Sequence, residues 1–191
     1  MRALHLIVFG LSICCVAPAV AQQPQGVGAP ETFGAQARAE NADGAAVSAP
    51  IVIHVNRYTP EFDKKRVEEG LRLGGYPGFV TALRKAPDVG YVEVTRHRFI
   101  IRYAREVVSE KGRTIVVVTD KPMAFLGGSM GESKPRTGYE LGAIELTIDG
   151  LGEGTGRMVA AARIKAGGET GVLIDNYAAD APIVLSKITR K

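Results

Sequence analysis

Apolar and polar residues alternate along most of the chain after residue 50. The first run, residues 51–58, places its isoleucines and Val55 on one side of an extended chain, which predicts a strand. Alternation returns in seven later runs, at 89–94, 97–108, 114–121, 141–149, 158–166, 172–177 and 183–189. Short turn sequences such as Asp149-Gly150 and Gly167-Gly168 separate these runs. Connections this short join antiparallel strands and cannot make parallel crossovers.

Between the first strand and the second, the apolar period changes to that of a helix. Thr59-Pro60 is typical of a helix N-cap followed by proline at the first helical position, and Gly74-Gly75 ends the predicted helix. A second short helix is predicted over 76–83, where four apolar residues recur with helical spacing. The sequence therefore predicts an α+β fold. Its sheet is mostly antiparallel, strongly curved or barrel-like, with about seven to eight strands and a two-helix insertion after the first.

The first 21 residues have the pattern of a signal peptide. Arg2 precedes an apolar stretch from Leu4 to Val16, and Ala19-Val20-Ala21 forms a small-x-small cleavage site before Gln22. The stretch is shorter than a membrane span, and the alternative is an N-terminal membrane anchor. We therefore expect export to the periplasm or the cell exterior, with no transmembrane segment after cleavage.

Residues 22–50 have the composition of a linker. They are dominated by Ala, Gly, Gln and Pro, and Phe33 is their only large apolar side chain. A segment of this kind buries too little apolar surface to offset its chain entropy, so it is predicted to be disordered. Residues 51–191 remain as a single globular α+β domain that is long enough for one core.

Charge and cysteine content narrow the class of function. The 24 Lys and Arg residues exceed the 20 Asp and Glu residues by four, and loss of Arg2 with a signal peptide lowers the formal charge to +3. This excess is too small to favour a nucleic acid as partner. Both cysteines, Cys14 and Cys15, lie in the predicted signal peptide. The mature chain would therefore contain no thiol for catalysis, disulfides or metal binding.

One short motif is typical of hydrolases. Residues 127–131 have the sequence Gly-Gly-Ser-Met-Gly, the nucleophile-elbow pattern, in which Ser129 would attack the substrate. That pattern needs a strand-to-helix turn and a downstream histidine, whereas His54 and His97 both precede it. We therefore predict a glycine-rich loop and assign no catalytic residue. His54 and His97, the two histidines outside the predicted signal peptide, make a poor metal set, so neither a metal nor a cofactor is expected. His97 is predicted to be partly buried.

The most distinctive run is residues 96–105. In a strand, Arg96, Arg98 and Arg102 point to one side, opposite Phe99. These three arginines are the candidate ligand-binding residues, because guanidinium groups bind the anions of an acidic polymer or a lipid headgroup. The alternative is an outer face that charge keeps solvated and protects from edge pairing.

Several short motifs occur in a fixed order along the chain. They are Arg57-Tyr58-Thr59, Val89-Gly90-Tyr91, Arg102-Tyr103-Ala104-Arg105, Thr119-Asp120-Lys121-Pro122, Glu145-Leu146, Gly152-Glu153-Gly154 and Asn176-Tyr177. Together they resemble a group of small secreted bacterial proteins known only as hypothetical. The resemblance covers most of residues 51–191. It implies a single secreted domain and carries no activity, cofactor or catalytic residue.

These observations favour an exported, non-enzymatic binding or interaction module. The first alternative is a small hydrolase that acts on a cell-envelope or extracellular substrate, through Ser129 or a pair of carboxylates. The second is an assembly module that pairs through an exposed strand edge. The run Ala160-Ala161-Ala162 bears on this choice. Small residues there either let a helix approach closely or leave room for a ligand inside a curved sheet.

Overall fold

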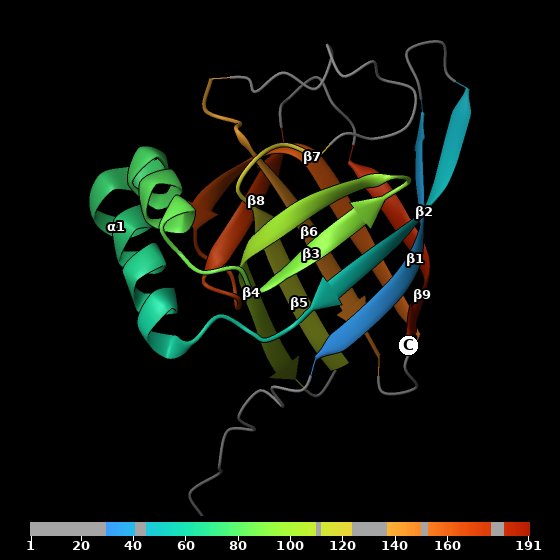
Figure 1. Cartoon of the computed structure of the whole chain (residues 1–191), viewed down its shortest axis with the longest axis horizontal. Helices are drawn as coiled ribbons and strands as arrows, with labels where there is room; N and C mark the ends of the chain where they lie inside the picture. The colour runs from blue at the N-terminus through green and yellow to red at the C-terminus, as the bar shows by residue number, and fades with distance from the viewer. Residues whose placement is uncertain (1–29, 41–44, 110–111, 124–136, 150–152, 177–181) are drawn as a thin grey trace, which may run out of the picture.

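Nine strands and one helix make up the part of the chain that the computed structural model describes, residues 30–40, 45–109, 112–123, 137–149, 153–176 and 182–191 (Figure 1). The strands are β1 (Glu31–Glu40), β2 (Ala46–Val55), β3 (Gly90–Val94), β4 (His97–Ser109), β5 (Gly112–Thr119), β6 (Leu141–Ile148), β7 (Gly154–Ala166), β8 (Val172–Asn176) and β9 (Ile183–Arg190). The helix, α1 (Glu61–Arg84), lies between β2 and β3.

Eight of the strands close into a barrel (Figure 1). Around its wall the order is β6-β5-β4-β3-β2-β1-β9-β7, and the pairing of β6 with β7 closes the ring. All of these pairings are antiparallel, as the short turns predicted. The ninth strand, β8, pairs with β7 outside the ring. The predicted fold class, a strongly curved antiparallel sheet with a helical insertion, is confirmed.

The barrel interior is filled with apolar side chains. Because successive residues of a strand point to opposite sides, every second residue of each strand faces inward. The large inward-facing residues that are almost fully buried include Phe33, Ile51, Ile53, Ile101, Ile115, Ile144 and Leu146. Interiors of this kind are packed as densely as organic crystals. The barrel interior is therefore a filled hydrophobic core.

The helix α1 covers part of the outer wall and forms a second apolar cluster with it. Its buried residues are Val67, Leu71, Tyr76, Phe79, Val80 and Leu83, which pack with wall residues such as Val116, Val118, Ala143 and Val159. The sequence predicted two helices; the structure has one element that is interrupted at Gly75, with φ 59° and ψ −153°. The two halves touch where a Cβ at Gly78 would lie 2.3 Å from the Gly70 carbonyl oxygen. Glycine at both positions permits this approach.

The alanine run in β7 lies at the junction of the two apolar clusters. Ala162 is buried in the cluster beneath α1, and the Tyr76 hydroxyl donates a hydrogen bond to its carbonyl oxygen at 3.3 Å. Ala160 packs against the interior cluster. Ala162 thus lies where a small side chain lets the helix approach the wall, which agrees with the first of the two interpretations of this run.

The predicted disordered linker is wrong for residues 31–40 and 46–50, which belong to β1 and β2. These strands pair over ten residues, from Glu31 opposite Val55 to Glu40 opposite Ala46. The structural cause is that alternate residues of β1 face the barrel interior, where even alanines become buried. The folded domain therefore begins before residue 51. Residues 1–29, including the predicted signal peptide, lie outside the described part of the chain.

Candidate binding site

The structure pairs two of the three candidate arginines with carboxylates. Arg96 is exposed in the turn between β3 and β4. Arg98, at the start of β4, forms an ion pair with Glu93 at 3.2 Å and lies over the Tyr91 ring, 4.0 Å from its centroid. Arg102 is mostly buried and belongs to a different network. Anion binding by these arginines stays a prediction. The ion pairs of Arg98 and Arg102 indicate that these two residues stabilise the fold.

The network around Arg102 ties β4 to the segments on either side of it. Arg102 forms ion pairs with Asp88 and with Asp120, the latter at 3.4 Å, and donates a hydrogen bond to the Ala86 carbonyl oxygen at 3.0 Å. At Arg102 itself, between Ile101 and Tyr103, the register of β4 against β5 shifts. The shift turns Tyr103 toward α1, where it packs with Phe79, although the sequence pattern placed it beside Phe99. A bulge of this kind has no signal in the alternation itself.

His54 lies on the outer side of the barrel wall, and His97 lies at the end of the wall, next to the turn between β3 and β4. His54 accepts or donates a hydrogen bond with the Thr32 hydroxyl at 2.6 Å and stacks on Tyr91 with ring centroids 5.0 Å apart. His97 is exposed, so the prediction that it is partly buried is wrong. In the described residues, no three His, Cys, Asp or Glu side chains gather closely enough to hold a metal ion.

A cluster of charged residues closes one end of the barrel interior. Glu31, whose side chain is only 2% exposed, accepts hydrogen bonds from Tyr58 at 2.6 Å and from Arg113 at 2.8 and 3.1 Å. Arg113 also pairs with the largely buried Glu106, and Arg190 reaches Glu31 at 2.9 Å. Two carboxylates and two guanidinium groups therefore balance in formal charge. Sequence reasoning missed this cluster because its members come from four separate parts of the chain.

Burial and hydrogen bonding shift the pKa of two members of the cluster, Tyr58 and Arg113. Burial, and then the hydrogen bond to Glu31, raise the pKa of Tyr58 above its usual value. Burial disfavours the Arg113 cation, but the hydrogen bonds to Glu31 and Glu106 outweigh this effect and raise the guanidinium pKa. Every buried side-chain nitrogen or oxygen in the described residues has a hydrogen-bond partner. The polar groups of this cluster form hydrogen bonds and ion pairs with one another. We therefore interpret the cluster as a structural element that closes this end of the barrel.

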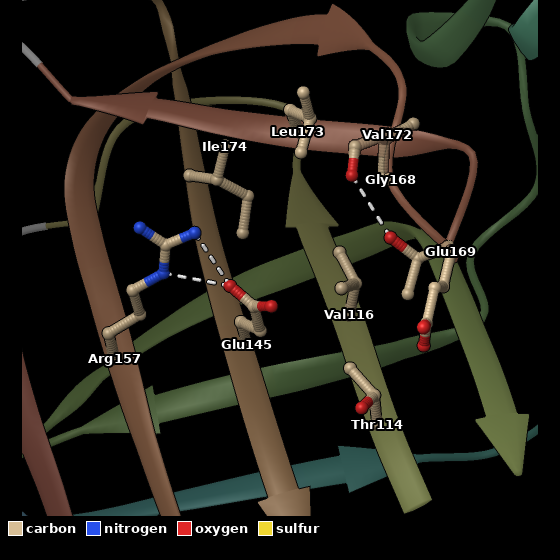
Figure 2. Close-up of a pocket in the computed structure, with 10 residues that line it drawn as sticks. Thr114, Val116, Glu145, Arg157, Gly168, Glu169, Val172, Leu173 and Ile174 are labelled. Atoms are coloured by element: carbon tan, nitrogen blue, oxygen red, sulfur yellow. Dashed lines mark hydrogen bonds and ion pairs between the residues drawn. The ribbon is translucent and has the colours of Figure 1, made fainter. Parts of the chain in front are cut away.

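A cavity of about 200 Å³ lies on the outer wall, beneath the hairpin of β7 and β8. It is lined by Thr114, Val116, Glu145, Arg157, Gly168, Glu169, Thr170, Val172, Leu173 and Ile174 (Figure 2). We call the surface formed by these residues the β8 groove. In Figure 2, the strand that carries Leu173 and Ile174 crosses over the strands that carry Val116 and Glu145.

The floor of the β8 groove combines apolar and charged groups. Thr114 and Val116 lie on alternate positions of β5, on the outer side of the wall. Glu145 of β6 stands directly opposite Arg157 of β7, and its carboxylate accepts hydrogen bonds from two guanidinium nitrogens at 2.8 and 2.7 Å (Figure 2). Glu169 is exposed at the rim and forms no ion pair with any residue that the structure describes.

One edge of β8 has no neighbouring strand in the part of the chain that the structure describes. β8 pairs only with β7 among these residues, and Figure 2 shows the Ile174 side chain of β8 directed toward the cavity. The backbone N–H of Gly167 donates a hydrogen bond to the Gly171 carbonyl oxygen at 3.3 Å. Hydrogen-bonded and non-hydrogen-bonded pairs alternate along an antiparallel hairpin, so the next hydrogen-bonded pair is Lys165 with Leu173. The backbone groups of Val172 and Ile174 then point away from β7. In agreement, the Val172 carbonyl oxygen accepts a hydrogen bond from the Thr170 hydroxyl at 3.0 Å.

The sequence predicted the parts of the β8 groove but not their assembly. The strand over residues 172–177 and the turn at Gly167-Gly168 were both expected, and β8 (Val172–Asn176) follows that turn. Nothing in the local pattern indicates that β7 leaves β9 partway along and continues beside β8. Ser129, the candidate nucleophile of the hydrolase hypothesis, lies outside the described residues.

Comparisons with models of protein families, with curated proteins and with solved structures found no significant match to this chain. Within the described residues, no helix combines the length and the apolar composition needed to cross a membrane.

Proposed function

We propose that this chain is an exported, non-enzymatic binding module that holds its partner in the β8 groove. Export is supported by the signal-peptide pattern of residues 1–21 and by the site before Gln22. The location of the site is supported by the contrast between the two sides of the barrel wall. The inside is a filled apolar core, whereas the outside carries a cavity next to β8, one edge of which pairs with no described strand.

The observation that carries the proposal is the meeting of three kinds of group in the β8 groove. The largely buried Val116 and Ile174 supply the apolar part of the lining, the Glu145–Arg157 pair supplies charge, and the edge of β8 supplies backbone donors and acceptors. Binding sites typically combine an apolar lining with a few placed polar groups. By comparison, the polar groups of the charged cluster at the barrel end form hydrogen bonds and ion pairs with one another.

Site-specific photo-cross-linking in the exporting cell tests this proposal. A benzophenone amino acid is placed at Thr114, on the floor of the groove, and in a second variant at Val52, a half-buried outer position of β2. We expect Thr114 to give a discrete higher-mass adduct and Val52 to give none, because only the first faces the partner. Adducts of equal yield at both positions, or at Val52 alone, would contradict the proposal.

A further inference from the structure

We infer that the occupant of the β8 groove is an extended peptide segment of a partner protein, which adds to β8 as a further strand. One apolar side chain of this segment fills the cavity, and a basic side chain faces Glu169. The inference rests on the proposed function, since it names the class of partner for the same site.

The backbone groups of β8 that do not pair with β7 favour strand addition. Ile174 directs both its N–H donor and its C=O acceptor toward the open edge, and Val172 directs its N–H there. A β-strand satisfies such groups in register, which is how strand-adding domains bind extended peptides. At about 3.3 Å per residue, the five residues of β8 would pair with roughly five residues of partner.

The size of the cavity fits a single side chain. Its volume of about 200 Å³ is below the range of roughly 300–1,000 Å³ that is usual for small-molecule pockets. Side chains of an added strand alternate between its two faces, so every second one would point down onto the outer barrel wall. One aliphatic side chain placed there would contact Val116 and Ile174, which line the cavity.

The geometry disfavours a second copy of this chain as the occupant. Two antiparallel strands are related by a local two-fold axis perpendicular to their sheet. Pairing β8 with β8 of another copy would therefore place both barrels on the same side of the joined sheet. The barrel wall already lies beneath the open edge, where Thr114 and Val116 form the floor of the groove (Figure 2). A single extended segment fits above that floor, whereas a second barrel does not.

The charges of the groove indicate the character of the segment. Glu145 and Arg157 neutralise one another, which leaves Glu169 as the unbalanced charge among the lining residues. A lysine or arginine in the partner would gain from this carboxylate, and an acidic segment would be repelled. Because Glu169 is exposed, the preference should weaken as the salt concentration rises.

The test uses a displayed library of random linear twelve-residue peptides, selected on the purified protein. The affinity of the selected peptides is measured for the wild type, for Thr114→Trp and for Thr189→Trp. The first substitution fills the floor of the groove, and the second is its matched control on an exposed position of β9. We expect Thr114→Trp to weaken binding by about tenfold or more and Thr189→Trp to leave it unchanged.

Two further measurements on one selected peptide identify strand addition. Methylating its backbone nitrogens one at a time should abolish binding at every second residue, because only alternate N–H groups of an added strand face β8. Binding should also slow hydrogen exchange at the Ile174 amide. The Leu173 amide, which the register already pairs with β7, serves as the internal control.

The outcomes separate the inference from the proposed function. If Thr114→Trp abolishes binding but methylation shows no alternation and the Ile174 amide stays unprotected, the site stands and strand addition is overturned. Failure of the library to yield peptides that Thr114→Trp weakens also overturns the inference, and the cross-linking experiment then decides the proposed function alone. A dimer of the free protein in which the Ile174 amide is protected would assign the edge to a second copy and overturn the inference.

Discussion

Replacing Phe33 by alanine should lower the free energy of unfolding by about 3–5 kcal/mol, the usual cost of removing a fully buried phenylalanine. Phe33 lies in β1 with no exposed surface, inside the barrel, although the composition of its segment is that of a linker. Denaturant unfolding of the purified wild type and variant measures this difference.

The matched control for Phe33 is Phe62→Ala. Phe62 is 76% exposed on α1, and substitutions at such positions usually change stability by less than about 0.5 kcal/mol. If both substitutions prove equally mild, β1 is not part of the core. The barrel would then lack one of its eight strands.

Replacing Arg113 by methionine should also lower the free energy of unfolding by about 3–5 kcal/mol, because it leaves two buried carboxylates without their shared cation. Arg113 bridges Glu31 and Glu106, whose side chains are 2% and 7% exposed. Arg190 and Tyr58 would still contact Glu31, but no other described cation reaches Glu106. Thermal or denaturant unfolding near neutral pH measures the loss.

Arg98→Met is the control for Arg113. Arg98 pairs with Glu93 on the surface, with both side chains more than one-third exposed, and such pairs contribute at most about 1 kcal/mol. A cost for Arg113→Met no larger than that for Arg98→Met would contradict the structural closure of the barrel end. The charged cluster would then be open to a functional interpretation.

The elements that the sequence predicted well are those with local signals. The alternation over 141–149 and 172–177 gave strands that match β6 and β8 to within one residue at each end. The helical insertion after the first predicted strand was likewise set by a proline at its start and by glycine at its break. Turn residues and apolar period act over a few residues, so a pattern can report them.

The elements that the sequence missed depend on contacts between distant residues. Ala35 and Ala37 become core residues only because β1 pairs with β2 and with β9, which lies about 150 residues further along the chain. Arg102 looked like part of a free cationic face because its partners, Asp88 and Asp120, lie outside its own strand. Alternation gives the side to which a residue points, but it does not identify the residues that it meets there.

The candidate site was the least predictable part of the molecule for the same reason. The β8 groove exists because β7 pairs with β9 through its first half and with β8 through its second. This bend carries β8 over the outer faces of β5 and β6, where Val116 and Glu145 lie (Figure 2). No run of residues along the chain describes such a crossing.

The most direct test of an outer binding site on a filled barrel is a methyl NMR titration of the purified, isotopically labelled protein with the selected peptides. We expect the methyl signals of Val116 and Ile174, which line the β8 groove, to shift on binding. The signals of Ile53 and Ile101, which are buried inside the barrel, should stay in place. Shifts confined to Ile53 and Ile101 would place the ligand in the barrel interior and contradict an outer binding site.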